Sequence, residues 1–352
     1  MDFCSNDYLG LARSPRLSQL TAQFLSHIQK AGATGSRLIT GNHSFIEELE
    51  QEIAQFHEAE AALLHNSGFD ANLGLLSCIA TKEDSILSDQ LIHASLIDGI
   101  RLSKAQKLIF RHNDLQHLEA QLKKAQGQIF VIVESVYSMD GDSAPLLDIE
   151  HLCRQYQAHL IVDEAHATGV FGKNGRGLVS ELGLTANVFA RVITFGKALG
   201  AHGAAVLGSH LLRDYLINFS RPFIFSTGLP MHSIASIKAA YLLLAESEPL
   251  LVQLKQNIDL LKKELAESVY GSALIPSESA IQCMVIPGAE KAKALAANVE
   301  RAGFYAKAIV YPTVAKGEER IRFCLHSFNE ASEIKKLIAC LKLAESAGQT
   351  SG

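Results

Sequence analysis

A β-branched run that leads into a glycine-lined turn with one lysine constrains this chain most. Residues 192–204 read VITFGKALGAHGA, so Val192–Thr194 is followed by Lys197 and then by glycines at positions 200 and 203. Glycine lets a backbone approach a ligand closely because it has no Cβ. The pattern predicts a strand and then a turn that holds an amine rigidly in a pocket. Taken alone, the segment is also compatible with a solvated surface lysine, which is the usual environment of this residue.

A second segment, residues 159–172, makes the pocket the better interpretation. Leu160–Val162 is a continuous apolar run, typical of a strand covered on both faces, and Asp163, Glu164 and His166 follow it. Ligands of open α/β sheets bind at the carboxyl ends of the strands. A carboxylate there can hold a protonated ring nitrogen, because an ion pair at low dielectric favours both charged forms. The alternative is that Asp163 caps the following turn.

A third segment predicts an anion site. Residues 61–64 have a strand pattern, residues 71–79 have a helical pattern, and Ser67, Gly68 and Phe69 lie between them. The free amide N–H groups at a helix N-terminus can bind a phosphate. The alternative is a simple N-cap by the Ser67 hydroxyl.

Charge and cysteine usage exclude several classes of function. The net charge is −5, and no apolar run reaches the length of a membrane span, which argues against nucleic acid or membrane as partner. The first residues, MDFCSND, lack the pattern of a signal peptide. Six cysteines are scattered without a C-x-x-C pair, which favours reduced thiols over disulfides or a metal site. These features predict a cytoplasmic protein without a bound metal.

The three segments belong to a longer series of motifs that resembles the α-oxoamine synthases, a branch of the fold-type I pyridoxal-phosphate enzymes. Within that branch the chain looks most like the 8-amino-7-oxononanoate synthases of biotin biosynthesis. The motifs that carry the resemblance are Ser5–Gly10 (SNDYLG), Gly35–Arg37 (GSR), Ser67–Phe69 (SGF), Ser88–Ser95 (SDQLIHAS), Ser138–Asp142 (SMDGD), Val162–His166 (VDEAH) and Thr194–Lys197 (TFGK).

The resemblance implies pyridoxal 5'-phosphate as cofactor and a role for each matching residue. Lys197 would bind the cofactor covalently, and Asp163 would pair with its ring nitrogen. His93 would stack on the ring, and His166 would bond the phenolic oxygen. Further contacts to the cofactor are implied for Gly68, Phe69, Ser138, Thr194 and, from the neighbouring subunit, Ser226 or Thr227. A homodimer with shared active sites follows from that last contact.

The substrates are also implied by the resemblance. Arg322 matches the arginine that binds the amino-acid carboxylate, Thr313 matches a position near the acyl substrate, and Asn6 lies in a motif near the active site. The amino acid would be L-alanine, and the acyl donor would be a pimeloyl thioester of coenzyme A or of acyl carrier protein. Val310 and Tyr311 stand where the family often has Arg-Pro, so recognition of the acyl chain can differ here.

The expected fold is α/β, as in fold-type I transferases. Residues 1–30 are predicted to form an N-terminal segment. Residues 31–249 would form a large cofactor-binding domain, in which helices cover a mostly parallel sheet. Residues 250–352 would form a small α+β domain.

Several related functions remain open from the sequence. Glycine C-acetyltransferase, 5-aminolevulinate synthase and serine palmitoyltransferase share the motifs of this branch. A plain aminotransferase and a non-catalytic cofactor-binding regulator or partner subunit are further alternatives. Silent subunits usually lack the lysine that this chain has at position 197.

Overall fold

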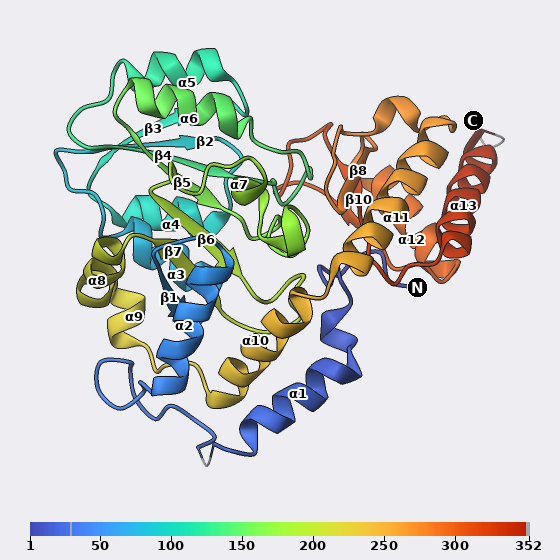
Figure 1. Ribbon diagram of the computed structural model, residues 1–352. Coiled ribbons are helices and arrows are strands. Elements are labelled where there is room, and N and C mark those ends of the chain that lie inside the picture. The colour runs from blue at the N-terminus through green and yellow to red at the C-terminus, as the bar shows by residue number, and fades with distance from the viewer. Residues whose placement is uncertain (29, 350–352) are drawn as a thin grey trace. The chain divides into compact units, whose positions relative to one another are not determined.

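The computed structural model describes residues 1–28 and 30–349, which divide into two compact units (Figure 1). The larger unit comprises Leu11–Tyr137 and Ala144–Glu246. The smaller unit comprises Met1–Gly10, Ser138–Ser143 and Ser247–Gly352.

A seven-stranded sheet with the order β1-β7-β6-β5-β4-β2-β3 forms the centre of the larger unit. Its strands are β1 (Ala61–His65), β2 (Ser85–Asp89), β3 (Gln106–Phe110), β4 (Ile129–Glu134), β5 (His159–Asp163), β6 (Ala190–Thr194) and β7 (Ala204–Gly208). Only β7 runs against its two neighbours, and the pairs from β6 to β3 are all parallel. The expected α/β fold with a mostly parallel sheet is confirmed.

Helices surround this sheet. They are α1 (Pro15–Leu25), α2 (Ser44–Phe56), α3 (Gly68–Leu76), α4 (Ala94–Leu102), α5 (Leu115–Leu122), α6 (Leu146–Gln155), α7 (Leu178–Glu181), α8 (His210–Phe219), α9 (Arg221–Phe225) and α10 (Met231–Leu244). Helices α5 and α6 lie on one face of the sheet, and α3 and α4 lie on the other (Figure 1). Parallel strands need such crossovers, which is why both faces become buried.

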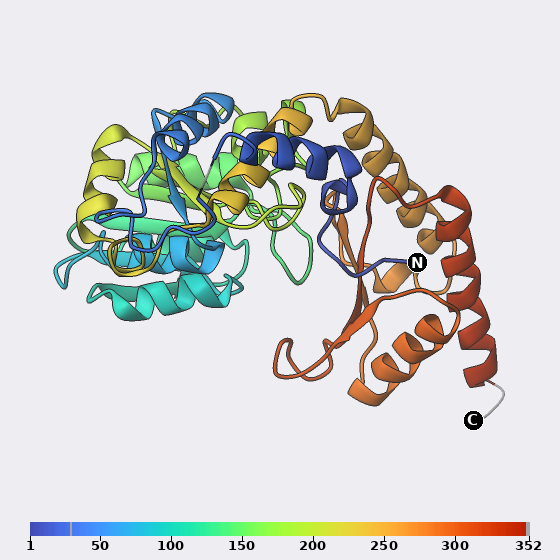
Figure 2. The ribbon, with the colours of Figure 1, turned by 90° about the horizontal axis from the view of Figure 1, so that it is seen from below.

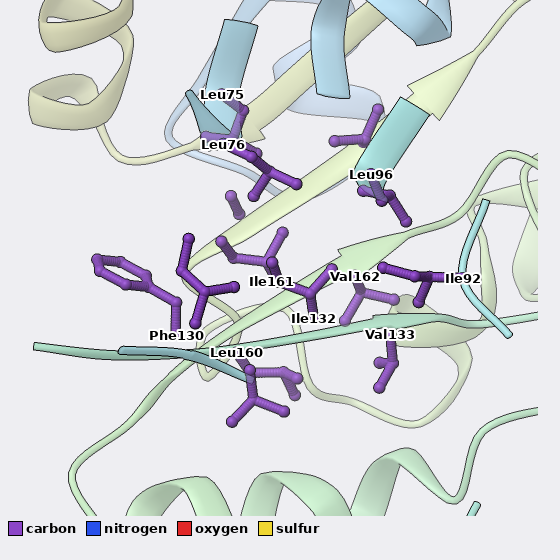
Figure 3. Close-up of a cluster of buried hydrophobic side chains, with 14 of the residues drawn as sticks. Leu75, Leu76, Ile92, Leu96, Phe130, Ile132, Val133, Leu160, Ile161 and Val162 are labelled. Atoms are coloured by element: carbon purple, nitrogen blue, oxygen red, sulfur yellow. The ribbon is translucent and has the colours of Figure 1, made fainter. Parts of the chain in front are cut away.

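The core of the larger unit explains the continuous apolar runs inside β4 and β5. Ile132 of β4 is the register partner of Ile161 of β5, and both side chains are fully buried. Leu75 of α3 and Leu96 of α4 point toward these two side chains (Figure 3). Because helices cover both faces, the central strands lack the polar alternation of a half-exposed strand.

The smaller unit contains a three-stranded antiparallel sheet with the order β8-β10-β9. Its elements are α11 (Glu248–Ala266), β8 (Ile281–Val285), α12 (Ala289–Arg301), β9 (Lys307–Ile309), β10 (Arg320–Cys324) and α13 (Ala331–Gln349). The three helices lie on one face of the sheet (Figure 2). In the central strand β10, Ile321 and Phe323 are buried, whereas Arg322 is half-buried on the opposite face.

Neither a membrane-spanning helix nor a metal-binding cluster is found among the residues that the structure describes. Among residues 1–28 and 30–349, no helix is both long and apolar enough to cross a membrane. In the same ranges, no group of three or more His, Cys, Asp or Glu side chains is arranged to hold a metal ion.

Candidate active site

The reactive side chains of the larger unit gather at the carboxyl ends of β5 and β6. Asp163 is the last residue of β5 and is the register partner of Val192 in β6. Strand β6 ends at Thr194, and residues 195–203 return the chain into the antiparallel β7. Lys197 lies in this connection, where its carbonyl accepts the Gly200 N–H at 2.9 Å. The tight turn is possible because Gly200 adopts a φ of +62°, in the left-handed region that glycine tolerates.

Lys197 and His166 form a close pair at this edge. Lys197 Nζ lies 2.8 Å from His166 Nε2, and His166 is nearly fully buried. An ammonium group has only donors, so this contact requires the lone pair of His166 at Nε2. The structure thus brings together the amine and the imidazole that the two sequence segments predicted.

Asp163 is held as a hydrogen-bond acceptor on both of its oxygens. Its Oδ1 accepts the Ala165 N–H at 2.9 Å, and its Oδ2 accepts an N–H of Asn72 at 2.7 Å. Asp163 and Asn72 are both buried. These two hydrogen bonds fix the orientation of the Asp163 carboxyl group at the end of β5.

His93 reaches the same group of residues from the start of α4. Its Nδ1 lies 2.8 Å from Ser95 Oγ, and Ser95 Oγ accepts the second N–H of the Asn72 amide at 2.9 Å. Partial burial lowers the pKa of His93, the Asp163 carboxylate raises it, and the Lys197 amine lowers it. Two charged groups therefore act on the histidine, Asp163 at the end of β5 and Lys197 in the connection after β6.

The N-terminus of α3 has the features of an anion site. The helix begins at Gly68, three residues before the predicted start, because Ser67 Oγ accepts the Asp70 N–H at 3.1 Å. The N–H groups of Gly68 and Phe69 have no acceptor within the described part of the chain. A Cβ on Gly68 would come within 2.6 Å of Thr194 Cγ2. Ser67 therefore acts as an N-cap and still leaves two amide donors for an anion.

A buried ion pair supports the chain directly after β5. Arg191 of β6 lies 2.8 Å from Glu164, and both side chains are almost completely buried. Arg191 also donates to the carbonyl oxygens of His57 and Arg176, and Glu164 accepts the Val179 N–H. This network fixes the backbone that carries the candidate site.

Ser226 and Thr227 lie in the loop after α9. The Thr227 carbonyl accepts an N–H of Asn66 at 2.8 Å, which joins this loop to the end of β1. Thr227 is exposed, and Ser226 is half-buried. Both side chains line a small pocket that also includes Arg37 and His65.

In the smaller unit, three predicted residues lie together around one guanidinium group. Arg322 Nε donates to the Ser138 carbonyl at 2.9 Å, and an Nη atom donates to Asn6 Oδ1 at 3.2 Å. The other Nη lies 3.0 Å from Cys324 Sγ. Ser138, for which a contact with the cofactor is predicted, orients Arg322 through its backbone carbonyl. Thr313 lies apart from this group on an exposed turn, where its N–H bonds the Val310 carbonyl.

Sequence reasoning did not single out Asn72. It lies inside an apolar helix without a recognisable motif, and only the packing of α3 against the sheet brings its amide to Asp163. Ser95 belongs to the matched motif, but no role was expected for it. A polar side chain on the apolar face of α3 is the one signal that could have identified Asn72.

Comparisons with known proteins agree with the motif series. The model of the family "Aminotransferase class I and II" matches residues 1–341. An 8-amino-7-oxononanoate synthase of Bacillus velezensis is 42% identical over 343 residues, which cover 97% of this chain and 87% of the relative.

Two solved structures are also similar. A structure of serine palmitoyltransferase with pyridoxal phosphate aligns with a TM-score of 0.94 at 27% identity, covering 99% of this chain and 87% of that one. The 8-amino-7-oxononanoate synthase of Francisella tularensis aligns with a TM-score of 0.86 at 28% identity, covering 99% and 98%. With the lysine, aspartate and histidines in place at the sheet edge, the chain belongs to the aminotransferase class I and II family, and within it to the α-oxoamine synthases.

Proposed function

We propose that this protein is a pyridoxal-phosphate-dependent synthase that condenses L-alanine with a pimeloyl thioester. The products would be 8-amino-7-oxononanoate, carbon dioxide and the free thiol of coenzyme A or acyl carrier protein. The observation that carries the proposal is the placement of Lys197 beside His166, at the strand ends where Asp163 is held as a carboxylate. The 42% identity to the Bacillus velezensis enzyme supports this choice of reaction.

The residues of the larger unit fit pyridoxal phosphate. The two unpaired amides of Gly68 and Phe69 suit a phosphate, and a side chain at position 68 would occupy the space beside Thr194. Asp163 suits a protonated ring nitrogen. When bound, the cofactor supplies an electron sink for a carbanion at the amino-acid α-carbon. Ser138 and, from a second subunit, Ser226 or Thr227 complete the proposed contacts, which makes the protein a homodimer in this proposal.

The chain's own residues would then handle the proton and the substrate. Lys197 would attach the cofactor at rest and, once released, take the α-proton of the amino acid. His166 would hold the phenolic oxygen and His93 would stack on the ring. Arg322 would bind the substrate carboxylate through its planar fork, with Asn6 beside it. Thr313 is proposed to contact the acyl donor.

A sister reaction is the second candidate, because the serine palmitoyltransferase structure aligns with the higher TM-score of 0.94. The two reactions differ in the amino acid and the acyl chain. The test therefore offers L-alanine, glycine and L-serine separately to the enzyme loaded with pyridoxal phosphate, together with pimeloyl-coenzyme A. Free thiol and carbon dioxide are measured, and both should appear in equal amounts with L-alanine.

Lys197→Ala tests the same proposal at the residue that carries it. We expect the rate to fall at least about 100-fold, since a positioned base contributes that much or more. Lys82→Ala is the matched control, because the Lys82 side chain is 78% exposed and should leave the rate unchanged. Turnover with glycine or L-serine but not with L-alanine would move the assignment to a sister synthase. Exchange of the amino group with a keto acid, without release of thiol, would indicate an aminotransferase.

A further inference from the structure

A continuous chain of hydrogen bonds connects Asp163 to His93. The Asn72 amide nitrogen bonds Asp163 Oδ2 at 2.7 Å and Ser95 Oγ at 2.9 Å, and Ser95 Oγ lies 2.8 Å from His93 Nδ1. Asn72 and Ser95 are both at least 98% buried. The two middle residues have no place in the proposed reaction so far.

The donors and acceptors of these hydrogen bonds can be assigned in only one way. The Asn72 nitrogen has two protons and uses one on Asp163 and one on Ser95. Turning the amide around would place its oxygen against the Asp163 carboxylate, which would be repulsive. Ser95 Oγ accepts from Asn72, so its single proton is available for His93 Nδ1.

A backbone hydrogen bond to His93 supports the same assignment of donors and acceptors. Its Nδ1 also accepts the Ser95 N–H at 3.2 Å, since His93 is the N-cap of α4. A nitrogen that accepts two hydrogen bonds carries a lone pair, so the proton of the neutral ring lies on Nε2. Protonation of Nδ1 would break the bond from the Ser95 N–H and force the Ser95 hydroxyl to turn its proton away. It would also place a cation at a helix N-terminus, which the helix dipole disfavours.

We propose that Ser95 and Asn72 are positioning residues that connect Asp163 to His93 and hold His93 as the tautomer with its proton on Nε2. The inference rests on the proposed function, because it gives His93 a defined task there. Stacked on the cofactor ring, the imidazole presents one N–H donor, at Nε2, to an oxygen of the substrate. The same amide donates to Asp163 Oδ2 and so holds that carboxyl group in place.

Ser95→Ala tests the assignment without relying on turnover. Diethyl pyrocarbonate modifies the unprotonated nitrogen of a histidine, and the extent at His93 can be followed by peptide mass spectrometry against pH. Loss of the Ser95 hydroxyl removes a hydrogen bond that favours neutral His93, so the pKa of His93 should rise by about 0.5 to 1 unit. The rate at which diethyl pyrocarbonate modifies fully neutral His93 should rise about fivefold, because Nδ1 is then less shielded. Asp163 and Lys197, the charged groups that act on His93, stay in place.

Ser103→Ala is the matched control, because Ser103 is a buried serine at the end of the same helix and its hydroxyl donates to the Ile100 carbonyl. It should change neither value. Ser95→Cys, which keeps a weaker donor, should give an intermediate shift and serves if Ser95→Ala does not fold. Unchanged pKa and rate in both Ser95 variants would overturn the inference.

The outcome also separates this inference from the proposed function. The modification is measured in the protein loaded with pyridoxal phosphate and in the protein without it, and kcat and KM for L-alanine are measured in parallel. We expect Ser95→Ala to lower kcat more than it changes KM, since the binding residues remain. A shift at His93 in a protein without condensation activity would support the tautomer and refute the reaction.

Discussion

Replacement of Gly68 by alanine tests the cradle at the start of α3. The new Cβ would come within 2.6 Å of Thr194 Cγ2, whereas the next nearest atom, Thr194 Cβ, lies 3.9 Å away. The obstacle is therefore a single methyl group on a stiff β-branched side chain. Overpacking of this kind costs about 1–3 kcal/mol, against about 0.5–1 kcal/mol gained from the better helix propensity of alanine.

We expect the clash to move the first turn of α3 away from Thr194 and with it the amides of Gly68 and Phe69. The net cost of the clash is about 1–2 kcal/mol, and we expect most of it to weaken the complex with pyridoxal phosphate. The affinity for the cofactor should then drop about 5- to 30-fold. Equilibrium titration of the protein with the cofactor, followed by visible absorbance, measures this affinity.

The companion substitution Thr194→Ser removes the obstructing methyl and keeps the hydroxyl. The double variant Gly68→Ala with Thr194→Ser should therefore recover most of the affinity that Gly68→Ala loses, which makes the two changes non-additive. The reasoning is refuted if Gly68→Ala binds the cofactor as well as the parent protein does. It is equally refuted if the double variant binds no better than Gly68→Ala alone.

Three further predictions concern other parts of the chain. Arg322→Lys should raise KM for the amino acid about 10- to 100-fold, because lysine loses the planar fork; steady-state kinetics with an unchanged KM would contradict the role of Arg322. Arg191→Met leaves the Glu164 carboxylate buried and unpaired, so denaturant unfolding should show a loss of about 3–5 kcal/mol; adding Glu164→Gln should restore much of it, and equal stability of the two variants would argue against the ion pair. Burial lowers the pKa of His65 to about 3, so the native state stays uncharged there while the unfolded state gains a proton below pH 6.5. The free energy of unfolding should fall as pH drops from about 6.5 toward 3, by about 2 kcal/mol between pH 6.5 and 5 from this residue, and His65→Leu should remove that part of the slope.

The strongest sequence predictions depended on local patterns. The apolar run before Asp163 and the β-branched run before Lys197 both proved to be strands, β5 and β6, because residues buried on two faces leave a continuous apolar signature. Edge strand β3 (Gln106–Phe110) was not predicted, since only its last residue is buried and its side chains follow no alternation. The start of α3 was placed three residues late, because Gly68 and Phe69 carry no helical periodicity and the Ser67 cap decides the boundary.

The sequence by itself determined which groups this protein has available: one lysine in a glycine-lined turn, an aspartate and a histidine after a buried strand, and an arginine that alternates with buried residues. Those features depend on neighbours in the chain. Only the tertiary structure decided that Lys197 lies 2.8 Å from His166, and that Asn72, 91 residues from Asp163 along the chain, donates to its carboxylate. Such contacts arise from the register of β5 against β6 and from the packing of α3 on the sheet, and a local pattern carries no record of them.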